Sequence, residues 1–145
     1  MIAIGSDHGG YLLKEEIKKH LDAEGIEYRD FGTDSTASCD YPVFAEKVCR
    51  SIQQGECEKG ILVCGTGIGM SMCANKCKGI RAAVCGDHFS AEFTRRHNNA
   101  NVLCLGARVI GPGVALQLVD VFLTTEYEGG RHEKRIEMMT ELENK

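Results

Sequence analysis

The feature that most constrains the fold is a short apolar run that ends in a cysteine and three alternating glycines. Residues 60–71 read Gly-Ile-Leu-Val-Cys-Gly-Thr-Gly-Ile-Gly-Met-Ser. The apolar run 61–63 predicts a buried strand, and residues 70–76 predict a helix. A glycine turn into a helix leaves backbone N–H groups free, and these groups and the helix dipole favour a negative charge. The dipole also favours a thiolate at Cys64, so the turn predicts an anion-binding nest beside a potential base or nucleophile.

Strand-like and helix-like segments alternate along the rest of the chain. Leu13, Ile17 and Leu21 recur every four residues before Gly25, a pattern typical of an amphipathic helix that ends at the glycine. The expected strands are 2–6, 26–31, 61–63, 79–85 and 101–105, and the expected helices are 11–24, 42–54, 70–76, 89–97, 113–125 and 132–144. Apolar strands with short connections to helices indicate a parallel sheet covered on both faces. We therefore expect one α/β domain over residues 1–145, a Rossmann-like three-layer α/β/α fold with a five-stranded parallel sheet and a C-terminal helix.

Composition narrows the class of partner. Hydrophobic residues make up 43% and charged residues 26% of the 145 residues, which is typical of a soluble globular domain. The net charge of −4 gives no basic footprint, so nucleic acid is not an expected partner. The sequence has neither a secretory leader pattern nor an apolar run long enough for a membrane span, and we expect a cytoplasmic protein without a membrane partner.

The eight cysteines do not form a recognisable framework. No C-x-x-C pair occurs among them, and no close His/Cys pair joins Cys73 and Cys77, so neither a metal site nor a thiol-redox motif is indicated. Most are expected to be small buried hydrophobic residues. Only Cys64 is set apart, by its position at a strand end.

Ligands of parallel α/β sheets bind beyond the carboxyl ends of the strands. The polar residues expected there are Asp7, His8, Asp40, Tyr41, Cys64 to Gly69, Asp87, His88 and Arg108. Each pair also has a purely structural interpretation, as a turn or a helix cap. The glycine turn matches neither G-x-G-x-x-G nor G-K-[ST], so a nicotinamide cofactor fits poorly even with Asp87 about 20 residues further on.

Two basic segments lie away from the strand ends. Arg131 and Arg135 are four residues apart, so they share a helix face and could hold a phosphate through forked hydrogen bonds. Cations at a helix start oppose the dipole, which favours a role for Arg131 beyond solvation. The segment 95–99 is equally well explained as a helix end, with basic residues facing the dipole and an asparagine as terminator.

Taken together, these residues resemble the ribose-5-phosphate isomerase B family, which includes the galactose-6-phosphate isomerase subunits. The resemblance covers nearly the whole chain and rests on six blocks in order. They are Ser6-Asp7-His8-Gly9-Gly10, Asp40-Tyr41-Pro42, Cys64-Gly65-Thr66-Gly67-Ile68-Gly69, residues 97–103, residues 106–111 and Arg131-His132-Glu133-Lys134-Arg135.

The resemblance implies an aldose–ketose isomerase of the pentose phosphate pathway that needs neither metal nor organic cofactor. It implies Cys64 as the base, His97 in ring opening, and Asp40 and Tyr41 lining the sugar. Asn98 would bind sugar hydroxyls, and Asp7 would lie at the substrate site. The implied phosphate pocket consists of His8, Arg108, Arg131, His132 and Arg135. The family is dimeric or a dimer of dimers, so His97, Asn98 and Arg108 are expected to reach the neighbouring subunit's site.

The chemistry agrees with the analysis of the turn. Removing a proton next to a carbonyl leaves negative charge on oxygen, which backbone N–H groups of Gly65, Gly67, Ile68 and Gly69 are placed to stabilise. Thr66 could pass a proton between the two oxygens. The main hypothesis is interconversion of D-ribose 5-phosphate and D-ribulose 5-phosphate. The alternatives are an isomerase of allose or galactose 6-phosphate, a non-catalytic phosphate-ligand binding module, and a thiol-redox protein.

Overall fold

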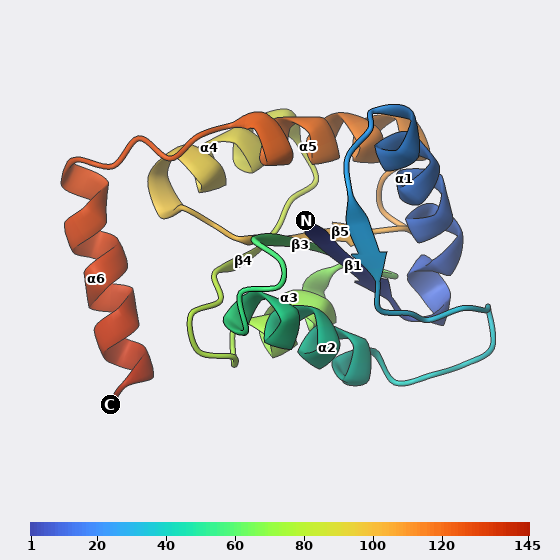
Figure 1. The fold of residues 1–145 in the computed structure, drawn as a ribbon, viewed down its shortest axis with the longest axis horizontal. Coiled ribbons are helices and arrows are strands. Elements are labelled where there is room, and N and C mark those ends of the chain that lie inside the picture. The colour runs from blue at the N-terminus through green and yellow to red at the C-terminus, as the bar shows by residue number, and fades with distance from the viewer.

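The computed structural model describes residues 1–145 and contains one parallel sheet between two helical layers (Figure 1). Its strands are β1 (Ile2–Ser6), β2 (Tyr28–Asp30), β3 (Lys59–Cys64), β4 (Ala82–Val84) and β5 (Val102–Gly106). Its helices are α1 (Tyr11–Ala23), α2 (Tyr41–Gln53), α3 (Ile68–Ala74), α4 (His88–Asn98), α5 (Pro112–Thr124) and α6 (Arg131–Glu143), with a 3₁₀ turn at His8–Gly10. The expected three-layer α/β/α class is confirmed.

The sheet has the strand order β2-β1-β3-β5-β4, with every pair parallel. Alternate residues of the central strands point to opposite faces: Ile61 and Val63 pack with α1, α4 and α5, whereas Leu62 and Cys64 pack with α2 and α3. Both faces are therefore covered, which explains why β3 is a continuous apolar run instead of an alternating one.

The predicted strand over 79–85 is longer than the observed β4. The N–H groups of Arg81 and Ala82 donate to the side-chain oxygens of Asn101 and Asn75, at 2.8 Å each. At the start of β4, these asparagine side chains therefore take the place of a neighbouring strand as hydrogen-bond acceptors. The predicted strand 26–31 likewise shortens to β2, and the predicted helix 70–76 becomes 68–74. The other boundaries agree within two residues.

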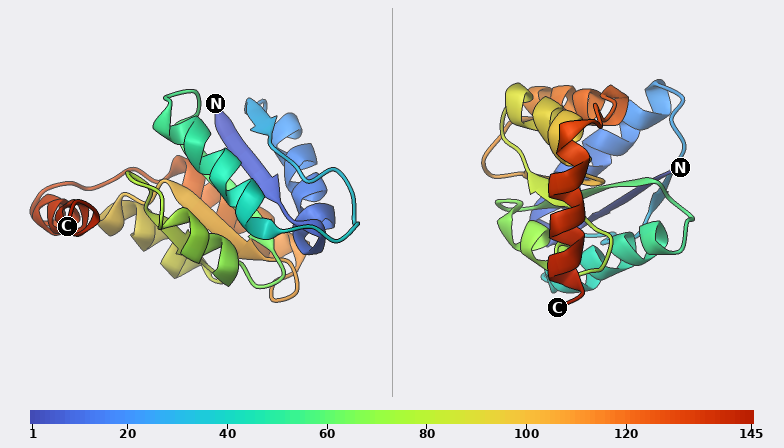
Figure 2. Two further views of the ribbon diagram at one scale, coloured as in Figure 1. Left: turned by 90° about the horizontal axis from the view of Figure 1, so that it is seen from below. Right: turned by 90° about the vertical axis from the view of Figure 1, so that its left-hand side faces the viewer.

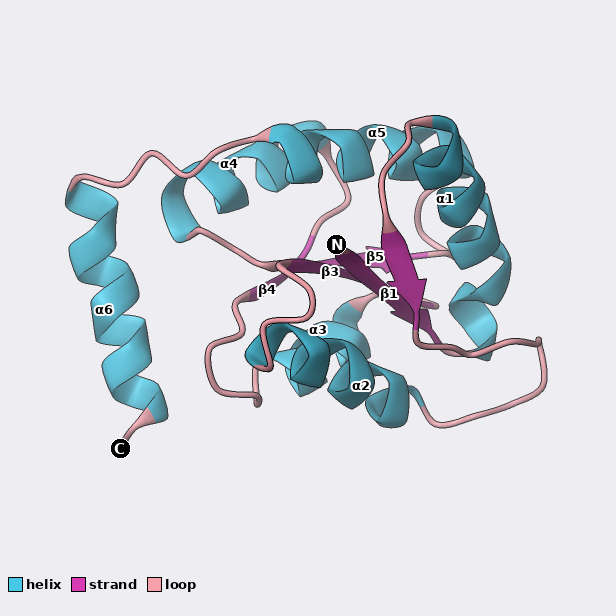
Figure 3. Cartoon of the chain, in the orientation of Figure 1, coloured by secondary structure: helices cyan, strands magenta, loops and turns pink.

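The C-terminal helix projects from one end of the molecule (Figure 2, left), where its last turn accepts the N–H of Gly79 through Glu143. Its only buried residues are His132 and Ile136, whereas Met138, Met139 and Leu142 are exposed. Figure 3 shows the long connection that carries the chain from α5 to α6. That connection ends in Gly129 and Gly130, whose φ values of 68° and 61° favour glycine. No helix of the chain has the length and apolar character of a membrane span.

Candidate active site

The carboxyl ends of β1, β3 and β5 are tied together by backbone hydrogen bonds. Asp7 donates its N–H to Val63 O at 3.2 Å, Ala107 to Cys64 O at 2.9 Å and Arg108 to Gly65 O at 3.0 Å. Because the three strands are parallel neighbours, the turns that follow them meet at one edge of the sheet. The chain thus forms the predicted polar edge.

Cys64 is the last residue of β3 and is 6% exposed. The N–H of Gly67 donates to its sulfur at 3.1 Å, and Gly67 has a φ of 79°, in the left-handed region. Helix α3 begins at the next residue, so the thiol lies at the helix N-terminus as predicted. Thr66 Oγ1 accepts the N–H of Ile68 at 3.2 Å, which fixes its side chain within the same turn.

The glycines of this edge allow unusually close packing. A Cβ on Gly10 would lie 2.3 Å from Val63 O, and one on Gly106 would lie 2.6 Å from Thr66 O. A Cβ on Gly69 would lie 2.7 Å from Cε1 of Tyr41. The ring of Tyr41 therefore lies on the glycine turn, and Asp40, which directly precedes it, begins α2 at the same place. The structure thus brings Tyr41 to the glycine turn, as predicted, with Asp40 next to it in the chain.

His8 and Arg108 flank the same turn. A Cβ on Gly65 would lie 3.5 Å from Cδ of Arg108, and one on Gly9 would lie 3.8 Å from its Nη2. His8 Nδ1 accepts the N–H of Cys39 at 3.2 Å, so the ring proton of neutral His8 is on Nε2. Asp7 is buried and accepts the N–H of Gly10 at 3.0 Å, which makes it a cap of the turn.

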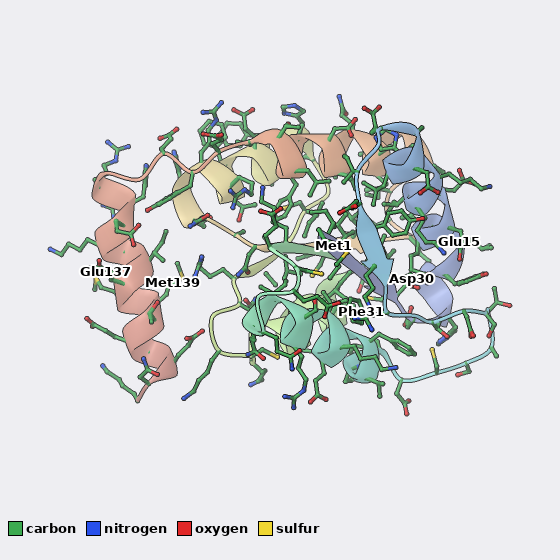
Figure 4. All side chains as sticks on the ribbon, viewed as in Figure 1. Met1, Glu15, Asp30, Phe31, Glu137 and Met139 are labelled. Carbon is green, nitrogen blue, oxygen red and sulfur yellow. The ribbon has the colours of Figure 1, made fainter.

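The remaining predicted residues lie at the opposite end of the molecule. His97 and Asn98 end α4, and Arg131, His132 and Arg135 begin α6, which stands at the left of Figure 1, far from the loop 32–40 at the right. In Figure 4 the same separation is visible between Asp30 and the α6 residues Glu137 and Met139. One chain therefore does not assemble the whole predicted site.

Arg108 lies at the glycine turn of its own chain, away from His97 and Asn98 at the end of α4. Arg108 follows β5, the direct neighbour of β3, so its backbone is hydrogen-bonded to Gly65 of its own chain. The predicted phosphate residues are consequently split between the two ends of the chain. His8 and Arg108 are at the glycine turn, and Arg131, His132 and Arg135 are on α6.

The second group is organised around two stacked imidazoles. The rings of His97 and His132 are 4.1 Å apart at 16°, and the ring of Phe93 meets His97 edge-on at 4.9 Å. Glu128 Oε1 lies 3.7 Å from His97 Nε2 and 3.6 Å from His132 Nε2. Glu128 was not among the residues predicted from sequence. It lies four residues before His132, a spacing at which side chains of one helix are neighbours, but Gly129 and Gly130 between them argued against a helix there.

Two histidines and a carboxylate within 4.8 Å of one another could be ligands of a metal ion. A zinc ion requires imidazole nitrogens at about 2.0–2.1 Å whose lone pairs converge on it. The rings of His97 and His132 are close to parallel, so their lone pairs do not converge. The observed arrangement fits a carboxylate-linked histidine pair better than a metal centre.

Most other thiols are removed from reactivity by burial. Burial raises the pKa of Cys85 to about 11 and also raises the pKa of Cys104. Burial and the neighbouring Cys77 raise the pKa of Cys49. All eight cysteines are free, and five are buried, in line with the expectation that most serve as small hydrophobic residues.

Comparison with known proteins gives consistent results. A family model described as Ribose/Galactose Isomerase matches residues 2–139. The ribose-5-phosphate isomerase B of Escherichia coli is 48% identical over 144 residues, which is 99% of this chain and 97% of that protein. The solved ribose-5-phosphate isomerase B of Clostridium thermocellum is 51% identical, with a TM-score of 0.97 over 99% of this chain and 97% of that one. That of Mycoplasma genitalium, solved with bound ribulose-5-phosphate, is 40% identical, with a TM-score of 0.94 over 99% and 96%.

Proposed function

This chain belongs to the ribose/galactose isomerase family, and we propose that it interconverts D-ribose 5-phosphate and D-ribulose 5-phosphate through an enediolate. The observation that carries the proposal is the position of Cys64, whose sulfur accepts the N–H of Gly67 at the start of α3. A thiolate in that place can remove a proton, and the surrounding backbone N–H groups can stabilise the oxyanion that forms.

The reaction is a proton transfer between neighbouring carbons. The Cys64 thiolate removes the proton from C2 of the open-chain aldose, and the electron pair of that bond forms the C1–C2 double bond of the enediolate. The negative charge on O1 faces the N–H groups of residues 65–69. The Cys64 thiol then protonates C1, while Thr66 transfers the hydroxyl proton from O2 to O1. No organic cofactor or metal takes part in these steps.

The other predicted residues bind the sugar phosphate. Asp40 and Tyr41 line the sugar beside Gly69, with Asp7 holding the turn that carries His8. His8 and Arg108 bind the phosphate from one side. Because the phosphate is remote from C1 and C2, its binding serves to orient the reacting carbons.

The site is completed by a second copy of the chain. Five predicted residues at the other end of the chain lie too far from Cys64 to share its substrate: His97, Asn98, Arg131, His132 and Arg135. We infer a homodimer, or a tetramer built from it, in which α6 and the end of α4 reach the partner's glycine turn. The exposed apolar residues of α6, Met138, Met139 and Leu142, support this inference.

The test is isomerisation of ribose 5-phosphate by the purified protein, followed by the appearance of ribulose 5-phosphate. Cys64→Ala is expected to lower kcat by about 10²–10⁴-fold, the usual contribution of an acid–base group. Cys77→Ala, a half-buried thiol outside the turn, is the matched control and retains activity. Faster turnover of allose or galactose 6-phosphate than of ribose 5-phosphate would overturn the substrate assignment. Full activity of Cys64→Ala would overturn the assigned base.

A further inference from the structure

Glu128 lies beside the stacked imidazoles of His97 and His132. Its Oε1 lies 3.7 Å from His97 Nε2 and 3.6 Å from His132 Nε2, while its Oε2 lies 3.8 Å from Arg96 Nη1. Arg96 is held more closely by Glu92, at 2.7 Å from its Nε. The Oε1 atom of Glu128 is therefore directed at the histidine pair.

The backbone also fixes Glu128 in this place. Its N–H donates to Arg96 O at 3.0 Å, next to His97 at the end of α4. One residue earlier, the hydroxyl of Tyr127 donates to Glu133 Oε2 at 2.9 Å, which ties the connection to the first turn of α6. The segment thus links the helix that carries His97 to the helix that carries His132.

His132 is 9% exposed at its side chain and lies beneath the half-exposed ring of His97. A ring so covered presents little surface to a phosphate, and its contacts are with His97 and Glu128. His97 is 36% exposed, so it is the member of the pair that can reach a substrate.

We propose that Glu128 is a positioning residue for ring opening: it fixes the His97–His132 pair and balances the positive charge that His97 acquires when it takes a proton from the sugar. This inference rests on the proposed isomerase function. Ribose 5-phosphate is present mainly as a furanose, whose ring must open before C2 can lose its proton.

In the ring-opening step, His97 alone can carry the proton from one oxygen to the other. His97 removes the proton from the anomeric hydroxyl, O1, and the C1–O1 double bond forms as the C1–O4 bond breaks. His97 then returns the same proton to O4. Between these transfers His97 is an imidazolium. The stacked ring of His132 has no negative charge to offset it, whereas the carboxylate of Glu128 at 3.7 Å has one.

Two reactions of one enzyme separate ring opening from enolisation. The first is isomerisation of ribose 5-phosphate, which includes ring opening. The second is exchange of the C1 hydrogen of ribulose 5-phosphate with D2O, followed by NMR. Ribulose 5-phosphate cannot close a ring because its O5 carries the phosphate, so its exchange requires only Cys64 and the oxyanion contacts.

Glu128→Gln keeps the size of the side chain and removes its charge. We expect it to lower kcat for ribose 5-phosphate by about 10–100-fold, part of the usual acid–base contribution, and to leave the exchange within about twofold of wild type. Glu126→Gln, an exposed carboxylate two residues earlier, is the matched control and changes neither reaction. Glu128→Asp, which retains the charge, is expected to recover part of the loss.

The outcomes distinguish the inference from the function on which it rests. An equal loss of both reactions would assign Glu128 to the support of α6 or to phosphate binding and would overturn the proposal, as would no loss in either. A wild-type protein that neither isomerises ribose 5-phosphate nor exchanges ribulose 5-phosphate would instead overturn the proposed function.

Discussion

The N–H of Gly67 donates to the sulfur of Cys64 at 3.1 Å, across a turn that only a residue with positive φ can make. This contact connects the end of the central strand β3 to the start of α3, so the fold itself supplies a donor to the thiol. The same turn packs against Tyr41 on one side and Arg108 on the other. Changes to the turn are therefore expected to affect catalysis and binding separately.

Gly69→Ala is predicted to weaken sugar binding. Its Cβ would lie 2.7 Å from Cε1 of Tyr41, and the half-exposed ring must move aside. Because the ring can move toward solvent, we expect less than about 1 kcal/mol of lost stability, below the usual cost of overpacking in a core. The KM for ribose 5-phosphate is expected to rise severalfold. Gly86→Ala, whose nearest neighbour would be 4.0 Å away, is the control, and an equal KM for both variants would contradict the prediction.

Asp30→Asn is predicted to destabilise the fold. Lys14 is completely buried, and its Nζ donates to both carboxylate oxygens of Asp30, at 2.7 and 2.8 Å, and to Thr33 O. Loss of the carboxylate leaves a buried ammonium without its counter-ion, which costs about 3 kcal/mol at the lower end for such pairs. Urea unfolding of this variant and of Asp34→Asn, an exposed carboxylate in the loop after β2, measures the difference. Equal stabilities would show that Lys14 is satisfied without Asp30.

The same ion pair predicts how stability depends on pH. Burial alone would raise the pKa of Asp30, but hydrogen bonds from Lys14 and Lys18 hold it below its usual value. The contribution of a carboxyl with a depressed pKa is complete above its unfolded pKa of about 3.9 and is lost as pH falls through the folded value. The stability difference between wild type and Asp30→Asn should therefore be constant above about pH 5 and shrink below about pH 4. A difference that grows in acid would contradict this sign.

Native thiol labelling is predicted to spare the buried cysteines. Burial raises the pKa of Cys85 to about 11, so fewer than about one in a thousand of its thiols are ionised at pH 7.5, and burial also raises the pKa of Cys104. Iodoacetamide treatment followed by peptide mass spectrometry should leave both unmodified in the folded protein and modify both in urea. Labelling of Cys104 at the same rate in the two states would contradict the observed packing.

The general fold followed from sequence because local signals agree with it. The Leu13, Ile17 and Leu21 repeat before Gly25 predicted α1, and Gly25 indeed ends it with a φ of 69°. The limits of β4 could not be predicted, because they depend on hydrogen bonds to the side chains of Asn75 and Asn101, 7 and 20 residues from their partners. The burial of Lys14 was missed for the same reason, since its partners Asp30 and Thr33 lie at the end of β2 and in the loop that follows it.

The candidate site was predictable at the glycine turn and less so elsewhere. Cys64 and Gly67 follow β3 and Arg108 follows the neighbouring β5, so topology alone brings these residues together. The separation of Arg131 from that edge depends on where α6 projects, which no local pattern specifies (Figure 2). Glu128 was missed because His97 and His132 come together beside it only after the chain turns at Gly129 and Gly130.

The most direct test of the central claim, a site built from two chains, is complementation between two inactive variants. Cys64→Ala removes the base from one end of the chain, and His97→Asn removes the ring-opening group from the other. In a mixed dimer one site carries both changes and the other carries neither. Co-expression of the two variants in equal amounts is therefore predicted to restore about one quarter of wild-type activity on ribose 5-phosphate, because about half of the dimers are mixed. Activity no higher than the mean of the two separate variants, in a sample shown by mass spectrometry to contain mixed dimers, would contradict the shared site.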